Sequence, residues 1–210
     1  GKDVLFTCLS SGISSTINNA FVCKEEMQEK YPDAEICVFD SICASGGHGL
    51  LIYHAIENKK KGMSVTENMQ ALEELKHRIV HKFTVDDLTY LQRGGRISKT
   101  AAVIGGMIQL KPVLHVDTEG RLAAESKVRG RKKALNQLLA EMDICTGSYA
   151  DKQDVVLICH ADCPEDAEYV RAKVEEKYHP NKIIMSEVGP IVGAHVGPGT
   201  MVLIFEGDKR

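Results

Sequence analysis

The chain has 210 residues, 43% of them hydrophobic, and a formal net charge of −3 at pH 7. This size and composition allow one large or two small globular domains with a real core, and the charge gives no overall reason to expect nucleic-acid binding. No apolar run approaches the length that spans a bilayer, and no charged-then-apolar leader opens the chain, so we expect a cytoplasmic protein without an integral membrane segment.

Seven cysteines occur, at positions 8, 23, 37, 43, 145, 159 and 163, and none forms a C-x-x-C pair. Cys8, Cys37 and Cys159 fall inside apolar runs, where reduced cysteine behaves as a small hydrophobe. We therefore expect no disulfide framework. The closest approach to a metal cluster, His160-Ala161-Asp162-Cys163, lacks a second ligand pair at usable spacing, so we expect neither a metal nor another cofactor.

The first part of the chain alternates between strand and helix patterns. Apolar runs at residues 3–9 and 35–40 predict buried strands, a helix follows the first of them, and further helices are expected at 50–60 and from a capping box at Ser64-Val65-Thr66-Glu67. Strand, helix and strand at this spacing predict a parallel α/β layer. Its ligand sites should lie beyond the carboxyl ends of the strands.

A hydroxyl-rich turn, Ser10-Ser11-Gly12-Ile13-Ser14-Ser15-Thr16, falls at that edge of the sheet. A helix N-terminus presents unpaired N–H groups and a positive dipole end, so hydroxyls there either cap the helix or help to hold an anion. Capping needs one hydroxyl and this turn offers five. An anion or carboxylate site is the favoured interpretation, with capping as the alternative.

The second part of the chain begins near residue 82, which divides the sequence into domains at 1–82 and 83–210. We expect a strand at 81–85, a helix at 87–92, a further helix after Ser98 that ends at Lys111-Pro112, and a hairpin of residues 113–116 and 122–128. Strands at 154–160, 182–187 and 201–205 and a helix at 164–178 complete the pattern. Two α/β units of similar size are predicted.

Basic residues gather in two places. Arg93 and Arg96 stand in the tight turn of residues 90–98, either as a solvated helix end or as guanidinium groups aimed at an anion or a partner. The run at 127–133 is the densest basic cluster, and a charge run of this kind is usually a solvated helix start. Positive charge at a helix start opposes the helix dipole, however, which strengthens the case for a functional reason.

The stretch of residues 188–199 contains four glycines and two prolines around His195. Proline fixes φ and glycine permits close backbone approach, so we expect a rigid path that is neither helix nor strand. Such a path either holds His195 against a ligand or is a tight turn with a packed histidine. The stretch alone does not favour one over the other.

Together, four segments resemble the DegV family of bacterial lipid-binding proteins: residues 10–16, Asp40-Ser41 with Ser45 and Gly49, residues 90–98 and residues 188–199. Lys111-Pro112 and residues 127–130 are similar to that family as well. The resemblance implies two α/β domains that face each other across a ligand-binding cleft. The chain departs from the family at Ser14-Ser15-Thr16-Ile17, where the family usually has Ser-Gly-Thr-Tyr. The chain also lacks the family's amino-terminal Thr-Ser-Gln-Pro segment, so we expect the first domain to be incomplete.

The resemblance also implies a function. Members hold one long-chain fatty acid between their domains and resemble the carrier subunits of fatty acid kinases, which present the carboxyl group to a separate kinase. By that resemblance, Ser11 and Ser14 contact the carboxylate, His195 approaches it from the other domain, and Arg96 and Arg129 face the kinase or the new phosphate. The implied protein is a carrier and not an enzyme.

Other functions stay open at this point. The main alternative is a serine-histidine acyl hydrolase with Ser11 or Ser14 as nucleophile and His195 as base, although the chain has no G-x-S-x-G elbow. A third hypothesis is that the serine turn binds the phosphate group of a small metabolite, but the chain lacks the Walker-type and dinucleotide-binding glycine spacings. The hypothesis of DNA binding through the basic run at 127–133 has still less support, because no recognition motif accompanies that run.

Overall fold

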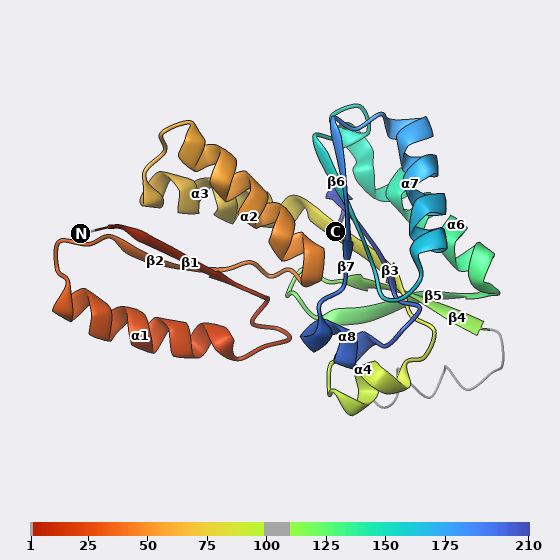
Figure 1. Cartoon of the computed structure of the whole chain (residues 1–210), viewed down its shortest axis with the longest axis horizontal. Helices are drawn as coiled ribbons and strands as arrows, with labels where there is room; N and C mark the ends of the chain where they lie inside the picture. The colour runs from red at the N-terminus through yellow and green to blue at the C-terminus, as the bar shows by residue number, and fades with distance from the viewer. Residues whose placement is uncertain (1, 99–109) are drawn as a thin grey trace.

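The first part of the chain builds a small parallel sheet. In the computed structural model, which describes residues 2–98 and 110–210, β1 (Val4–Cys8) pairs in parallel with β2 (Ile36–Asp40). The helix α1 (Thr16–Lys30) connects them, because parallel neighbours require a crossover. The predicted strand, helix and strand are confirmed, and Figure 1 shows α1 along one side of this sheet and α2 and α3 along the other.

Two helices and a short 3-10 turn then lead to the next strand: α2 (Ser45–Lys60), α3 (Val65–Leu75) and Lys76–Arg78. The predicted capping box is present, since Ser64 Oγ accepts a hydrogen bond from the N–H of Glu67 and Glu67 Oε2 accepts one from the N–H of Ser64. Helix α2 begins five residues before the predicted start. Glycines at its first turn allow this, because Gly46 lies against Cys159 and Gly47 against His81.

The rest of the chain forms a six-stranded sheet in the order β5-β4-β3-β8-β6-β7. Only β6 and β7 are parallel neighbours in it, and the other pairs are antiparallel. The strands are β3 (Ile79–Thr84), β4 (Leu110–Val116), β5 (Leu122–Arg129), β6 (Val155–His160), β7 (Lys182–Glu187) and β8 (Met201–Glu206). The helices are α4 (Thr89–Arg93), α6 (Arg131–Thr146), α7 (Pro164–Tyr178) and α8 (Pro190–Val196), with a 3-10 turn at Gly147–Tyr149.

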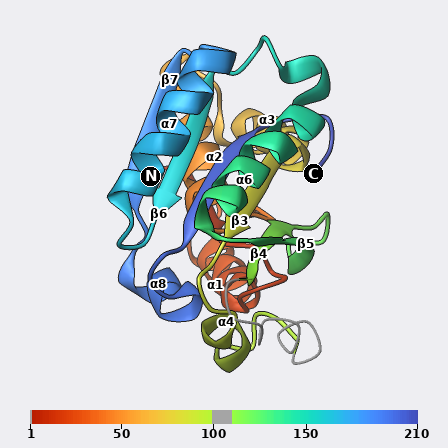
Figure 2. The ribbon, with the colours of Figure 1, turned by 90° about the vertical axis from the view of Figure 1, so that its right-hand side faces the viewer.

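Helices cover both faces of this sheet. On one face, α6 packs on β3, β4, β5 and β8, and α7 packs on β6 and β7 (Figure 2). On the opposite face, α2 packs on β3, β6 and β8, which joins the first unit to the second. Strand β8 contributes side chains to a hydrophobic core on each face of the sheet, because successive side chains of a strand point to opposite faces. Leu203 and Phe205 belong to the core under α6 and α7, and Val202 and Ile204 belong to the core under α2. The predicted α/β fold class is confirmed.

Two predicted boundaries differ from those in the structure. Residue 82 falls inside β3, so the whole strand pairs in the six-stranded sheet rather than being divided between two domains. Lys111 and Pro112 were expected at the end of a helix and instead lie in β4, where they pair with β5. The helix expected between Ser98 and Lys111 lies outside the described residues. The hairpin of β4 and β5 is confirmed.

The prediction that residues 188–199 contain no helix is wrong. Residues Pro190 to Val196 form α8, with Pro190 at its first position. Proline is tolerated there because the N–H that it lacks would have no partner within the helix, and its fixed φ suits the helix start. Glycine-rich composition misled the prediction, since Gly193 adopts ordinary helical geometry. Among the described residues, no helix has the length and hydropathy needed to cross a membrane.

Candidate functional site

A cavity lies where the two units meet. Its empty volume is about 850 Å³, which includes open space at its mouth. Twelve of its eighteen lining residues are apolar, so its walls favour a largely apolar ligand. The apolar lining residues are Leu9, Ile13, Ala44, Phe83, Leu91, Val116, Leu122, Val188, Ile191, Val192, Val196 and Val202, and the polar ones are Ser14, Ser45, His81, Arg96, His195 and Thr200.

The serine turn after β1 brings Ser14 to this cavity. The N–H of Ser14 donates to the carbonyl of Ser10 at 3.0 Å, and the N–H of Gly12 donates to Ser10 Oγ at 3.0 Å. The Ser14 hydroxyl pairs with Thr16 Oγ1 at 2.9 Å and accepts from the N–H of Thr16 at 3.3 Å. The turn is therefore ordered by its own hydroxyls, while Ser15, the N-cap of α1, makes no side-chain capping hydrogen bond.

The same turn rests on the hairpin of the second unit. A side-chain carbon at Gly120 would lie 1.9 Å from Ser10 Oγ, and one at Gly12 would lie 2.8 Å from the carbonyl oxygen of Glu119. Only glycine leaves room for this approach, and Gly120 also has a φ of +75°. Close contact between the units thus fixes the wall of the cavity at Ser14.

His195 reaches the cavity from α8. Its ring lies against Gly94, where a side-chain carbon would be 2.2 Å from Nδ1. Gly94 is the C-cap of α4, and its lack of a side chain leaves space for this ring. Helices α4 and α8 pack side by side (Figure 1). His195 is half-buried, so one part of its ring stays accessible to a ligand.

Arg96 joins the serine turn to α4. Its Nε donates to the carbonyl of Ile13 at 3.1 Å and its Nη1 donates to the carbonyl of Gly94 at 2.6 Å. Ile13 precedes Ser14 in the chain and Gly94 contacts His195, so these contacts gather Ser14, Arg96 and His195 into one polar group. A half-buried guanidinium here also supplies positive charge to the cavity.

Three further polar residues at the cavity, Ser45, His81 and Thr200, were not predicted as ligands. Ser45 begins α2 with a φ of +45°, and His81 lies on β3 with 1% of its surface exposed. His81 Nε2 accepts a hydrogen bond from the N–H of Ala44 at 3.3 Å. Burial, together with repulsion from Arg210, lowers the pKa of His81 to about 3, so the ring is neutral. Ser45 belongs to one of the segments that carried the family resemblance, and no sequence pattern marked His81 or Thr200.

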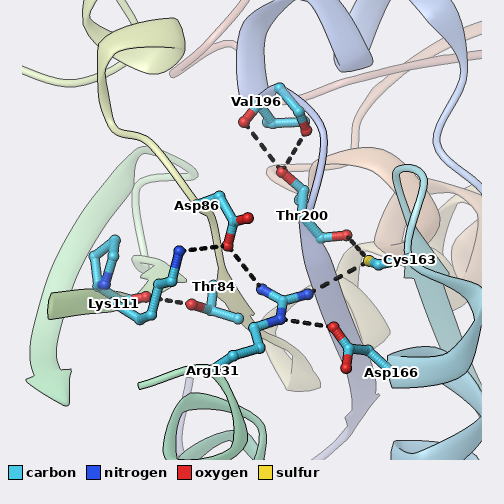
Figure 3. A network of polar contacts seen from close by, with 10 residues as sticks. Thr84, Asp86, Lys111, Arg131, Cys163, Asp166, Val196 and Thr200 are labelled. Atoms are coloured by element: carbon cyan, nitrogen blue, oxygen red, sulfur yellow. Dashed lines mark hydrogen bonds and ion pairs between the residues drawn. The ribbon is translucent and has the colours of Figure 1, made fainter. Parts of the chain in front are cut away.

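A polar network holds the chain that follows α8 (Figure 3). The Thr200 hydroxyl donates to the carbonyls of Val196 and Gly197 at 3.1 and 2.9 Å, which satisfies acceptors at the end of α8. The Cys163 thiol donates to the Thr200 carbonyl at 3.4 Å. Arg131 donates to the Cys163 sulfur at 3.4 Å.

Arg131 also pairs with carboxylates in this network. Its Nε lies 2.7 Å from Asp166, its Nη1 lies 3.4 Å from Asp86, and Asp86 accepts from Lys111 Nζ at 2.8 Å as well. One member of the predicted basic cluster is therefore neutralised by ion pairs. Arg131 thereby links α6 to α7 through Asp166, and it links both to the residues after α8 through Cys163 and Thr200.

Two predicted site residues lie elsewhere. Ser11 is exposed, is not among the cavity-lining residues, and its N–H donates to Asp40 Oδ1 at 3.1 Å. Arg129 is exposed at the end of β5 and does not line the cavity either. The described part of the chain contains no group of three or more His, Cys, Asp or Glu side chains arranged to hold a metal ion.

Fold and cavity together define an α/β protein with a largely apolar cavity between two units. A sequence model described as "Uncharacterised protein, DegV family" matches residues 1–208. The chain is 40% identical over 210 residues to the DegV domain-containing protein CPE0026 of Clostridium perfringens, with 100% of this chain and 72% of the relative covered. The chain therefore belongs to the DegV family.

Solved structures of this family share the fold. One described as "Fatty Acid Binding of a DegV family Protein from Thermus thermophilus" has a TM-score of 0.84 and 27% identity, covering 98% of this chain and 71% of that one. The fatty acid kinase B3 protein of Streptococcus pneumoniae, loaded with linoleic acid, has a TM-score of 0.91 at 21% identity and covers 99% of this chain and 73% of that one. The second likeness concerns the fold alone.

Proposed function

We propose that the protein binds one long-chain fatty acid in the cavity between its two units. The observation that carries this proposal is the combination of mainly apolar walls with the polar group of Ser14, Arg96 and His195. A fatty acid has the same two parts, a long apolar chain and one charged carboxylate. The fatty-acid-binding structure from Thermus thermophilus supports this choice of ligand.

Physical magnitudes agree with such a ligand. Burial of each methylene contributes about 0.8 kcal/mol, so a sixteen-carbon tail offers roughly 11 kcal/mol before the costs of binding are subtracted. A buried carboxylate without partners is costly, so hydroxyl, imidazole and guanidinium donors must surround it. Ser14, His195 and Arg96 supply one of each. Catalysis has less support, because the Ser14 hydroxyl pairs with Thr16 rather than with a base.

Presentation of the carboxylate to a separate kinase is the second part of the proposal. Helix α8 carries His195 and also Ile191, which lines the cavity and is 79% exposed, so the cavity wall at α8 adjoins the protein surface. A partner that docks there would reach the head group. Arg129, exposed at the end of β5, would then face the partner or the phosphate. Formation of acyl phosphate from loaded protein, a purified fatty acid kinase subunit and ATP tests this part.

Binding of palmitate and oleate, measured by isothermal titration calorimetry, tests the first part. Ser14→Ala and His195→Ala should each weaken binding about 10-fold, because each removes a donor to a charged group. Ser11→Ala is the matched control, since Ser11 belongs to the same turn and does not line the cavity. An equal loss in Ser11→Ala and Ser14→Ala would move the head group out of the cavity, and no binding by the unmodified protein would refute the proposal.

A further inference from the structure

Asp40 joins two turns that form part of the cavity wall, although it does not line the cavity itself. It is the last residue of β2, and its Oδ1 accepts hydrogen bonds from two backbone N–H groups. One belongs to Ser11 in the serine turn, at 3.1 Å and 29 positions away in sequence, and the other to Ile42, at 3.0 Å. A single carboxylate oxygen therefore ties the chain after β1 to the chain after β2.

Each of these turns leads directly to the cavity. The serine turn continues to Ser14, and the chain after β2 continues to Ala44 and Ser45, and all three residues line the cavity. A backbone contact also joins the turns, because the N–H of Ser10 donates to the carbonyl of Cys43 at 2.9 Å. A displacement of one turn would therefore move lining residues in both.

The chain after β2 has a backbone conformation that needs support. Ile42 has a φ of +46°, and Ser45, at the start of α2, has a φ of +45°. Positive φ is uncommon for any residue with a side chain, and it is least favourable for a β-branched one such as isoleucine. A residue keeps such a conformation only where the surrounding contacts enforce it.

Hydrogen bonds on both sides of Ile42 enforce its conformation. Its N–H donates to Asp40 Oδ1, and its carbonyl accepts from Arg210 Nη2. Arg210 Nη1 donates to the carbonyl of Lys76 at 2.9 Å, and Lys76 Nζ donates to the carbonyl of Asp40 at 3.2 Å. Of these acceptor atoms, Asp40 Oδ1 is the one that also accepts from the serine turn.

We propose that Asp40 is a positioning residue for lipid binding, which holds the serine turn and the start of α2 in the relative position that the carboxyl end of the lipid requires. This inference rests on the proposed function. Asp40 acts through two backbone N–H groups, because it is not among the cavity-lining residues. The role depends on an acceptor oxygen and not on negative charge, since a negative charge near a bound carboxylate would by itself weaken binding.

Three substitutions separate this role from general support of the small sheet. In Asp40→Asn the amide oxygen can still accept both hydrogen bonds, whereas Asp40→Ala loses both. Asp3→Ala is the matched control, because Asp3 Oδ1 accepts from the N–H of Glu35 at 2.9 Å and so joins the same two strands at their opposite end. Calorimetric titration with palmitate measures affinity. Amide hydrogen exchange in the free protein measures how well the two turns are held.

We expect Asp40→Ala to bind palmitate about 10-fold more weakly than the unmodified protein, and Asp40→Asn and Asp3→Ala to bind within about 3-fold of it. The amides of Ser14 and Gly47 are hydrogen-bonded within the serine turn and the first turn of α2. Both should exchange at least about 10-fold faster in Asp40→Ala than in the other two variants.

Two affinity results would overturn the inference. One is unchanged palmitate affinity in Asp40→Ala, and the other is an equal loss in Asp40→Ala and either Asp40→Asn or Asp3→Ala. If the unmodified protein bound no palmitate, the proposed function would fail instead. Amide exchange would still test the coupling of the turns, and unchanged exchange of Ser14 and Gly47 in Asp40→Ala would refute it.

A measurement on the unmodified protein does not depend on how any variant folds. Scalar couplings across hydrogen bonds, measured by NMR, should connect the amide nitrogens of Ser11 and Ile42 to Cγ of Asp40. Both couplings should be present in the free protein and should persist at saturation with palmitate. Loss of both couplings in the lipid-saturated protein would overturn the inference.

Discussion

Gly94→Ala is the substitution that tests most sharply whether His195 must lie where the structure places it. Gly94 has a φ of −70°, so alanine is compatible with its backbone. The new methyl group would lie 2.2 Å from Nδ1 of His195, 3.1 Å from Cε1 and 3.3 Å from Cγ. The substitution therefore changes little except the space available to one imidazole.

The size of the effect follows from these distances. The new carbon would be about 1.2 Å inside the shortest ordinary contact of 3.4 Å, so the ring must move by about an ångström. Overpacking typically costs about 1–3 kcal/mol in a closed core. His195 is half-buried and can swing toward solvent, so we expect a small loss of stability and a larger loss of ligand binding. A displaced donor to a carboxylate should weaken palmitate binding about 10-fold, or about 1.4 kcal/mol.

Calorimetric titration with palmitate and urea unfolding, carried out on the same preparations, separate the two effects. Gly193→Ala is the matched control, because a side-chain carbon there meets nothing within 4 Å and replaces a glycine inside α8. It should leave affinity unchanged and stabilise the protein by about 0.5–1 kcal/mol. Unchanged affinity in Gly94→Ala, with the protein folded, would refute the role assigned to His195.

Three further predictions concern stability. Lys82→Met should lower the free energy of unfolding in urea by about 3–5 kcal/mol, because Lys82 is 2% exposed and its ammonium lies 2.8 Å from Glu125 and 3.6 Å from Glu141; a loss below about 1 kcal/mol would contradict this. Ser64→Ala removes the capping box of α3 and should cost about 1 kcal/mol in the same assay, whereas no change would show that the box contributes nothing. The pKa of His81 is lowered to about 3 from an unfolded value near 6.5, so the unfolded chain gains a proton first as pH falls. The stability contributed by the neutral ring should therefore decline from about pH 6.5 to about pH 3 and level off below that. The same pH dependence of thermal unfolding in His81→Gln as in the unmodified protein would contradict this.

Local patterns were sufficient for much of the fold and part of the site. Short apolar runs bounded by turn residues predicted the strands, and the capping box predicted the start of α3. Ser14 and His195 were identified through motif resemblance, and both line one cavity. Ser11 stands three residues from Ser14 with the same hydroxyl, and only the backbone path of the turn separates the two.

Other features depend on contacts between distant residues. Arg96 meets the carbonyl of Ile13 across 83 positions of sequence, and no local pattern encodes that pair. His81 reaches the cavity because the pairing of β3 with β4 and β8 decides which face its side chain occupies. The helix α8 was missed because glycine and proline indicate turns on average. Their position within a segment decides whether they are compatible with a helix, and Pro190 occupies the first position of α8, where proline is favourable.

Native mass spectrometry of the purified protein, before and after incubation with palmitate, measures directly whether each chain holds one fatty acid. We expect a complex of one palmitate per chain, with competition between palmitate and oleate for a single site. A folded protein that carries no lipid from its source and takes up neither fatty acid on incubation would contradict it.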